Sequence, residues 1–420
     1  MAKGFFDIQQ LKSTEINSKT FLSCASCGLY KTCLSPKMEP FGQFKKKILW
    51  IGEAPGEIED RRGKPWQGRM GQSLQRTVKK FGVDLFRDGI GLNACSCRPP
   101  KNRTPSSYEL SCCRNKLINH IKEFKPNLIF LIGASPINSI IGKNFNKKIA
   151  GVSTWRSYVI PDQDLNAWVC PIFHPSFVAR KEEKNGQNLT QVIWEQDIEN
   201  ALLYINKPIP KIQPEKYIHL VETDKEFKKV YEELMESDLM AFDYEATGLK
   251  PHSSGHKIIT VSACPNPTKS YSWMNTPYRA KLFARVLSNQ KIRKIAHNLS
   301  FENMWSNIIL KTEVKNWYWD TMINNHIIDN RPGINGLKFL SHVFFGVGEY
   351  NEIIDPYLKS PDKSGANAHN KLIEFVKKYG TKEVMKYCAL DSLLCFWLFI
   401  KQTELMGFTD ETIHLPSCPF

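Results

Sequence analysis

Two carboxylate residues lie two positions apart at the end of an apolar segment. Asp243 and Glu245 follow Leu239–Phe242, whose composition predicts a β-strand. Alternate residues of a strand face the same side, so we expect both carboxylates to point together. Two carboxylates at one place repel each other unless they share a cation, and Mg²⁺ and Mn²⁺ prefer such hard oxygen ligands. The competing interpretation is a pair of surface acids.

Two later segments add groups of the same chemical kind. Tyr387 and Asp391 lie four residues apart within the apolar segment Val384–Phe399, which predicts a helix with both side chains on one face. Glu302 closes the segment His297–Glu302. Together with Asp243-Tyr-Glu245, these segments resemble the 3′–5′ exonuclease domain of family A DNA polymerases, over about residues 217–402.

This resemblance implies a ribonuclease H-like fold with a DEDD-type site that contains a tyrosine. It implies that Tyr387 orients the attacking water and that two divalent cations, Mg²⁺ or Mn²⁺, clamp the scissile phosphate. The residues implied as cation ligands are Asp243, Glu245, Glu302 and Asp391. Glu302 stands where the family usually has Asp, so a weakened exonuclease is an alternative.

Three polar residues near these segments have a simpler explanation. Asp320 opens the predicted helix that contains Asn316–Asn325, and Asp is a good helix cap. We therefore expect Asp320 to be structural. His297 and Asn298 are expected to support the site or pack beside it, not to bind metal.

Cysteines form a second group of chemically capable residues. Eight of the 12 lie before residue 171. Cys24 and Cys27 form a C-x-x-C pair, and fifteen residues separate Cys97 from Cys113. Four thiolates from two distant segments suit Zn²⁺ or an iron–sulfur cluster, and spacing does not decide between them. Small buried thiols are the alternative interpretation, and three further cysteines compete as ligands: Cys33, Cys95 and Cys112.

A turn rich in glycine and proline lies between these cysteines. The predicted strand Lys46–Ile51 runs into Gly52-Glu-Ala-Pro-Gly56, and α/β sheets place ligands at the carboxyl ends of their strands. Glu53 would stand at that strand end. Trp66, a few residues later, has a face on which a base can stack. Taken as pattern alone, this segment is also compatible with an ordinary turn.

Several motifs here resemble the iron–sulfur uracil-DNA glycosylases called family 4. They are CASCG, GEAPGEIEDRRGKPWQGRMG, NACSCRPPKNRTP and FHPSF, in that order between about Cys24 and Arg180. The resemblance implies a [4Fe–4S] cluster on Cys24, Cys27, Cys97 and Cys113. It also implies a uracil pocket formed by Glu53, Trp66, Asn93 and His174. Trp66 stands where the family usually has Phe, which changes the pocket volume and leaves the accepted base open.

The chemistry of base removal suits these residue types. The enzyme must extrude a base and stabilise a cationic sugar while uracil leaves as an anion. Asn93 can donate to and accept from the uracil edge, and Trp66 would stack on the ring. His174 would hydrogen-bond the leaving oxygen, and Glu53 would orient water or stabilise the cation.

The order of predicted elements indicates how these residues are positioned. Strands and helices alternate before a proline-rich segment, which predicts an α/β/α domain with a parallel central sheet. After that segment, strands Leu239–Tyr244 and Lys257–Ala263 precede a region dominated by helices from about Tyr278. We therefore expect two α/β domains, with the following limits: glycosylase-like domain 1–205, linker 206–216, exonuclease domain 217–402 and tail 403–420.

The composition supports a polyanionic partner. Lys and Arg number 57 against 42 Asp and Glu, a net charge of +15, and nucleic acid is the commonest partner of such chains. No uninterrupted apolar run reaches the ~18 residues of a membrane helix, and the N-terminus lacks a signal-peptide core. We expect a cytoplasmic protein, in the host cytoplasm if a phage encodes it, with no membrane partner.

A glycosylase-like domain before an exonuclease-like domain resembles the front part of some bacteriophage DNA polymerases. We expect an exonuclease fused to a uracil-DNA glycosylase, acting on single-stranded 3′ ends and uracil-containing DNA. The alternative keeps the nuclease and makes the first domain a non-catalytic module that binds DNA or tethers a polymerase. A polymerase domain needs several hundred further residues. The chain would thus be a stand-alone enzyme, one part of a split polymerase whose other part is a separate chain, or a truncated form.

Overall fold

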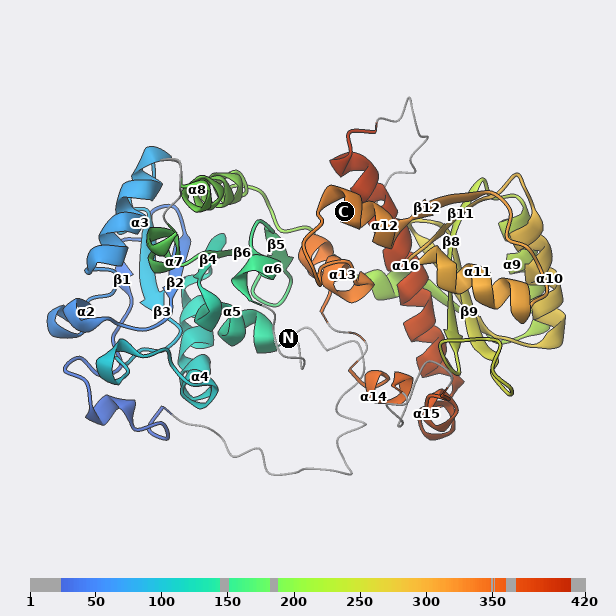
Figure 1. The fold of residues 1–420 in the computed structure, drawn as a ribbon, viewed down its shortest axis with the longest axis horizontal. Helices are drawn as coiled ribbons and strands as arrows, with labels where there is room; N and C mark the ends of the chain where they lie inside the picture. Colours follow the sequence, from blue (N-terminus) through green and yellow to red (C-terminus); the bar gives the residue numbers. More distant parts are fainter. Residues whose placement is uncertain are drawn as a thin grey trace. The chain divides into compact units, whose positions relative to one another are not determined.

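The computed structural model describes residues 24–143, 151–181, 188–348, 350, 352–359 and 368–408. It divides into two compact units. The first ends at Lys211 and also includes His342–Val347, and the second begins at Ile212. Each contains one six-stranded sheet (Figure 1). Among the helices of the described ranges, none has the length and apolar character needed to cross a membrane. The predicted tail lies outside the described residues from 409 onward.

The first sheet has a parallel centre and two antiparallel edges. Its order is β1-β3-β2-β4-β6-β5, in which β3, β2, β4 and β6 run parallel. The edge strands β1 and β5 pair antiparallel. They were not predicted, because two or three residues carry no alternating pattern. The strands are β1 Phe41–Gly42, β2 Ile48–Gly52, β3 Gly89–Asn93, β4 Leu128–Ile132, β5 Ile160–Asp162 and β6 Ala167–Ile172.

Helices cover both faces of this sheet, so every residue of β2 and β4 is buried. Side chains of α3, α7 and α8 join the core on one face, where Trp50 stacks on Phe130 at 4.4 Å. The helix α5 contacts β2 and β4 and packs beside α4. The α-helices are α2 Glu57–Arg62, α3 Arg69–Lys80, α4 Ser107–Phe124, α5 Ala134–Ile140, α6 Val152–Trp155, α7 Pro175–Arg180 and α8 Leu189–Leu202. Short 3₁₀ turns lie at Leu29–Lys31, Pro100–Asn102 and Ile141–Lys143.

The second sheet mixes both strand directions. Its order is β12-β11-β8-β9-β10-β7, in which β9 is antiparallel to both β8 and β10 and the other neighbouring strands pair in parallel. The region after Tyr278 is therefore not only helical, because β11 and β12 complete the sheet there. The strands are β7 Ile218–Val221, β8 Leu239–Ala246, β9 Ile258–Asn266, β10 Lys269–Met274, β11 Arg293–Ala296 and β12 Trp317–Asp320.

The two faces of β8 have opposite character. Phe242 and Tyr244 join the core formed with α9, α10 and α11. Asp243 and Glu245 point the other way, toward α16, which crosses β8, β9 and β10. The helices are α9 Asp224–Met235, α10 Pro277–Ser288, α11 Leu299–Ile308, α12 Thr321–Ile328, α13 Leu337–Phe345, α14 Asp355–Leu358, α15 Leu372–Tyr379 and α16 Thr381–Leu405. A 3₁₀ turn, Pro214–Tyr217, precedes β7.

Asp320 is a helix cap, as predicted. Its carboxylate accepts the backbone N–H groups of Met322 and Ile323 at the start of α12, and of Asn298 and Leu299 at the start of α11. The helix begins after Asp320, since residues 317–320 form β12.

Candidate active sites

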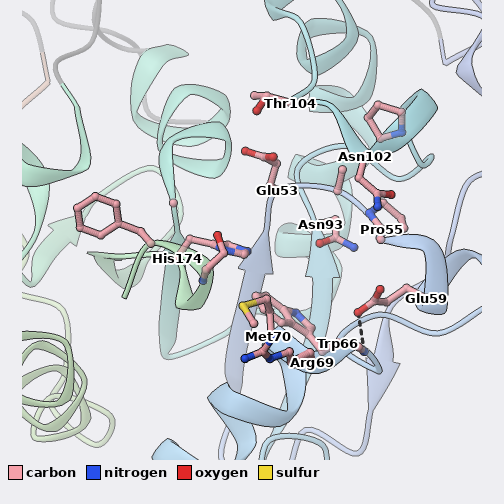
Figure 2. Close-up of a pocket in the computed structure, with 18 of the residues that line it drawn as sticks. Glu53, Pro55, Glu59, Trp66, Arg69, Met70, Asn93, Asn102, Thr104 and His174 are labelled. Carbon is pink, nitrogen blue, oxygen red and sulfur yellow. Dashed lines mark hydrogen bonds between the residues drawn. The ribbon is translucent and has the colours of Figure 1, made fainter. Parts of the chain in front are cut away.

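A cavity of about 980 Å³ opens at the carboxyl ends of the parallel strands in the first unit. Glu53 directly follows β2, Asn93 ends β3 in register with Gly52, and His174 lies just beyond β6. Trp66 precedes α3 and also lines the cavity (Figure 2). The structure thus brings together all four residues predicted for the uracil pocket.

Trp66 lines this cavity and is only 6% exposed. Its indole N–H donates to the Trp50 carbonyl over 3.2 Å. The ring lies so close to the sheet that a Cβ on Gly91 would stand 2.5 Å from it, and one on Gly52 2.7 Å. These two glycines are therefore required for the indole to fit. The His174 ring lies 6.2 Å from it, with 26° between the planes.

His174 is held as a neutral imidazole with a defined tautomer. Its Nδ1 accepts the Ser176 backbone N–H over 3.2 Å and lies 2.8 Å from the Ser176 hydroxyl. An accepting Nδ1 leaves the proton on Nε2. Burial, with the charge of Arg180, lowers the pKa of His174 to about 4. At neutral pH the residue is therefore an uncharged N–H donor.

Sequence reasoning missed several groups around this cavity. The Ser135 hydroxyl, from α5, donates to Glu53 Oε2 over 2.8 Å and fixes that carboxylate. The lining also includes four cationic residues suited to phosphate: Arg61, Arg69, Arg103 and Arg180. The sequence showed only an overall positive charge, not where the positive side chains gather.

The cysteines predicted as cluster ligands lie in two parts of the first unit. Cys97 follows β3, Cys113 lies in α4, and both are buried. The Cys97 sulfur accepts the Lys37 backbone N–H over 3.2 Å. Cys24 and Cys27 are half-buried in a turn. That turn meets α4 where the Tyr108 hydroxyl donates to the Ser26 carbonyl over 3.3 Å.

Three further thiols lie among these four. Cys95 Sγ is 4.0 Å from Cys113 Sγ, and the thiols of Cys33 and Cys112 interact with those of Cys97 and Cys27, respectively. In the described part of the chain, no three of these sulfurs lie within 4.8 Å of one another. A four-iron cluster is larger than a single ion, so its ligands need not be that close. The all-sulfur donor set fits an iron–sulfur cluster.

Burial keeps at least one of these thiols protonated when no metal is bound. Burial, together with the neighbouring Cys33 and Cys113, raises the pKa of the Cys97 thiol to about 12. Metal binding would release that proton and offset the cost of burying a thiolate.

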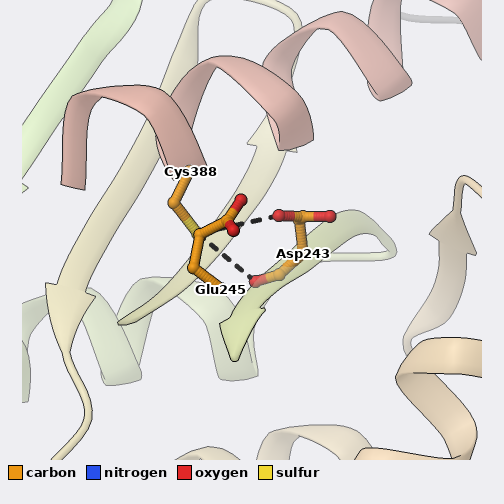
Figure 3. A group of neighbouring side chains, drawn as sticks. All are labelled: Asp243, Glu245 and Cys388. Carbon is orange, nitrogen blue, oxygen red and sulfur yellow. Dashed lines mark hydrogen bonds between the residues drawn. The ribbon is translucent and has the colours of Figure 1, made fainter. Parts of the chain in front are cut away.

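In the second unit, three potential ligand atoms lie within 4.8 Å of one another. They belong to Asp243, Glu245 and Cys388 (Figure 3). Cys388 is fully buried on α16, and its sulfur lies 3.8 Å from Asp243 Oδ2 and 3.6 Å from the Asp243 carbonyl. Sequence reasoning missed Cys388. Its position next to Tyr387, on a helix predicted to be apolar, could have indicated that Cys388 lies near the site.

The other predicted exonuclease residues converge on the same place. Burial, followed by the charge of Asp391, raises the pKa of Asp243 well above its ordinary value. Burial and the charges of Asp243 and Asp391 likewise raise the pKa of Glu245. Burial and the charge of Asp243 raise the pKa of Glu302. The Oε2 atom of Glu302 is buried and has no hydrogen-bond partner. Repelling carboxylates with an unsatisfied oxygen fit a site for divalent cations.

Sequence reasoning also missed Lys338 and Tyr350. The Lys338 ammonium donates to Asp391 Oδ1, and also to the Tyr350 hydroxyl over 2.7 Å. The Tyr350 hydroxyl in turn donates to Asp391. Lys338 lies in the segment Gly336–Leu340, about fifty residues from its carboxylate partner, and only the fold brings them together.

Comparisons with known proteins assign both units. Residues 39–196 match the uracil DNA glycosylase superfamily and residues 218–405 match the 3′–5′ exonuclease family. The type-4 uracil-DNA glycosylase of Thermotoga maritima is 32% identical over 193 residues, which covers 46% of this chain and 95% of that protein. That of Sulfurisphaera tokodaii is 33% identical over 174 residues, covering 40% and 76%.

The chain therefore belongs to the uracil DNA glycosylase superfamily through its first unit, and its second unit is a 3′–5′ exonuclease domain. A DNA polymerase of Bacillus phage SP01 is 22% identical over 355 residues, 76% of this chain but only 37% of that protein. This fusion is consistent with a role in DNA repair or replication.

Similarity to solved structures is weaker. Brucella melitensis NrnC aligns with a TM-score of 0.30 and 18% identity, covering 47% of this chain and 85% of that one. Escherichia coli RNase D aligns with a TM-score of 0.34 and 14% identity, covering 47% and 48%.

The carboxylate cluster makes a prediction about stability. Above pH 4.5 the unfolded chain releases the Glu245 proton, whereas the folded chain holds it because its pKa is raised, so the free energy of unfolding falls as pH rises. In chelator at pH 7.5, we expect Glu245→Gln to raise the free energy of unfolding by on the order of 1–2 kcal/mol. The gain should shrink toward pH 4. Thermal unfolding of the full chain measures both. A loss of stability at pH 7.5 would contradict the prediction.

Proposed function

We propose that this chain is a DNA-processing enzyme with two activities, a metal-dependent 3′–5′ exodeoxyribonuclease and a uracil-DNA glycosylase. The observation that carries the nuclease is the convergence of Asp243, Glu245, Glu302 and Asp391 from three distant segments on one buried place. The matching observation for the glycosylase is the meeting of Asn93, Glu53 and His174 in one cavity.

In the nuclease, two divalent cations held by the four carboxylates would activate water and stabilise the leaving 3′ oxygen. Tyr387 lies on the same face of α16 as Asp391 and is buried beside the carboxylates. Its hydroxyl would orient the attacking water. Burial of the site excludes bulk water, which strengthens each electrostatic contact there.

In the glycosylase, the everted uracil would lie over the indole of Trp66, with its edge paired to the Asn93 amide. The bond between C1′ and N1 breaks, and its electron pair leaves on uracil. The Nε2–H of neutral His174 would hydrogen-bond the uracil oxygen on which charge develops. Glu53, held by Ser135, would stabilise the cationic sugar and orient the water that adds to C1′.

Cofactors and partners complete the proposal. The first unit would carry a [4Fe–4S] cluster on Cys24, Cys27, Cys97 and Cys113, with Cys33, Cys95 and Cys112 as neighbours. The substrates would be single-stranded 3′ ends and uracil-containing DNA, in the cytoplasm. A DNA polymerase on a separate chain is a proposed partner.

One observation favours a second candidate function for the first unit. Trp66 lines the cavity with a larger ring than the family's usual Phe, and Gly52 and Gly91 lie directly against that ring. If the remaining space rejects every base, the unit would be a non-catalytic module that binds DNA or tethers a polymerase.

The nuclease is tested on single-stranded DNA labelled at its 5′ end. In Mg²⁺ or Mn²⁺ we expect stepwise shortening from the 3′ end. Asp243→Ala should slow it by roughly 10²–10⁴-fold, because bound cations contribute several kcal/mol to such reactions. The exposed Asp238→Ala is the matched control. Digestion by Asp243→Ala at the wild-type rate would contradict the nuclease assignment.

The glycosylase is tested on a uracil-containing oligonucleotide with chelator present to silence the nuclease. We expect alkali-sensitive abasic sites, formed roughly 10- to 100-fold more slowly by Asn93→Ala because the paired base edge loses its partner. The exposed Asn200→Ala on α8 should behave as wild type. DNA binding without abasic sites would favour the module instead.

The cluster is tested by metal content and absorbance of the purified chain. We expect about four iron atoms per chain and a broad band near ~400 nm. Both should be lost in Cys97→Ser and kept in Cys170→Ala, whose thiol lies in the sheet core. Zinc in place of iron in the wild type would refute the cluster.

A further inference from the structure

Lys338 is bound inside the exonuclease site. It is the second residue of α13, and only 22% of its side chain is exposed. Its ammonium donates to Asp391 Oδ1 and to the Tyr350 hydroxyl. The same Asp391 oxygen also accepts from Tyr350, so a cation and a phenol together hold this carboxylate.

Two aromatic rings complete the surroundings of this ammonium. It lies 4.1 Å from the centroid of the Tyr350 ring and 4.3 Å from that of Tyr387. Aromatic faces attract cations at such distances. One of these rings belongs to the tyrosine proposed to orient the attacking water. The Lys338 ammonium is therefore in contact with residues of the site on several sides and is not a solvated surface lysine.

The position of this cation matters because of the charges around it. Its charge favours the ionised forms of Asp243 and Glu245, against the effect of burial. Asp391 is one of the four proposed cation ligands, and the oxygen that Lys338 holds is unavailable to a divalent cation while that bond lasts. The four-carbon stem of lysine is flexible, so the ammonium can leave without movement of the helix backbone.

We propose that Lys338 is the resident counter-ion of the exonuclease site and competes with one divalent cation for Asp391. It offsets part of the carboxylate repulsion before cations bind, and it sets the cation concentration at which the site fills. Lys338 is thus a positioning residue that acts through Asp391. This inference rests on the proposed nuclease function, since it takes Asp391 as a cation ligand.

The test measures Mn²⁺ binding calorimetrically on the full chain, freed of divalent cations and without DNA. Removing a charge-assisted bond from the competing partner should strengthen binding, so we expect Lys338→Met to bind Mn²⁺ on the order of tenfold more tightly. Its melting temperature in chelator should fall, and added Mn²⁺ should restore it. Lys338→Gln gives the same comparison with a neutral side chain whose amide is a hydrogen-bond donor.

Two controls separate competition from a general effect of charge or structure. Lys386→Met removes a lysine that precedes Tyr387 and pairs with Glu383, and it should leave Mn²⁺ affinity within about twofold of wild type. In an Asp391→Asn background, Lys338→Met should no longer change the affinity for Mn²⁺, because the carboxylate shared by the lysine and the metal ion is gone.

The outcomes are distinguishable. Unchanged or weaker Mn²⁺ binding by both Lys338 variants overturns the competition, as does an equal gain in the Asp391→Asn background. A wild-type chain that binds no Mn²⁺ overturns the proposed metal site itself. Tighter binding that depends on Asp391 supports the inference, whatever the rate of DNA digestion.

Discussion

Repulsion among buried carboxylates is the constraint on which the second unit depends. Strand β8 places Asp243 and Glu245 on the face covered by α16, and that helix adds Asp391 to the same place. Like charges in a poorly hydrated site raise one another's pKa and favour any cation that can enter. Within the described residues of this unit, the Lys338 ammonium is bonded to Asp391, and α16 packs on the sheet beside these carboxylates.

The docking of α16 shows how the site is held against that repulsion. Small polar residues of the sheet meet the helix directly. The Ser262 hydroxyl donates to the Cys388 carbonyl over 2.7 Å, and the Ser270 hydroxyl donates to the Ala389 carbonyl over 2.8 Å. These two carbonyls lie within the helical turn that runs from Tyr387 to Asp391. Neutral hydrogen bonds thus fix the helix register, and the register fixes where the charged groups fall.

Sequence patterns predicted which acidic residues of the second unit come together, but not the residues that surround them. The start of α4 follows from its local sequence, because Ser106 and Glu109 form a capping box. Residues two or four apart were placed correctly because strand and helix periods are local properties. Lys338, Tyr350 and Cys388 were missed because their partners lie far away in the chain. The edge strand β1 was missed since its pairing comes from its neighbour and not from its own two residues. Cysteine spacing likewise did not reveal how closely Cys33 and Cys95 approach the predicted ligands.

The two units separate hard from soft donors, with one exception that the structure itself resolves. Oxygen ligands select Mg²⁺ or Mn²⁺, whereas thiolates select zinc or iron–sulfur clusters. Cys388 places a sulfur among the oxygens of the second unit. Burial and the charges of Asp243 and Glu245 raise the pKa of its thiol well above the ordinary value, so it remains protonated and donates toward Asp243. Mg²⁺ and Mn²⁺ prefer the carboxylate oxygens beside this thiol, so it is not expected to bind them. The crowding of carboxylates that attracts hard cations thus also keeps the thiol of Cys388 protonated.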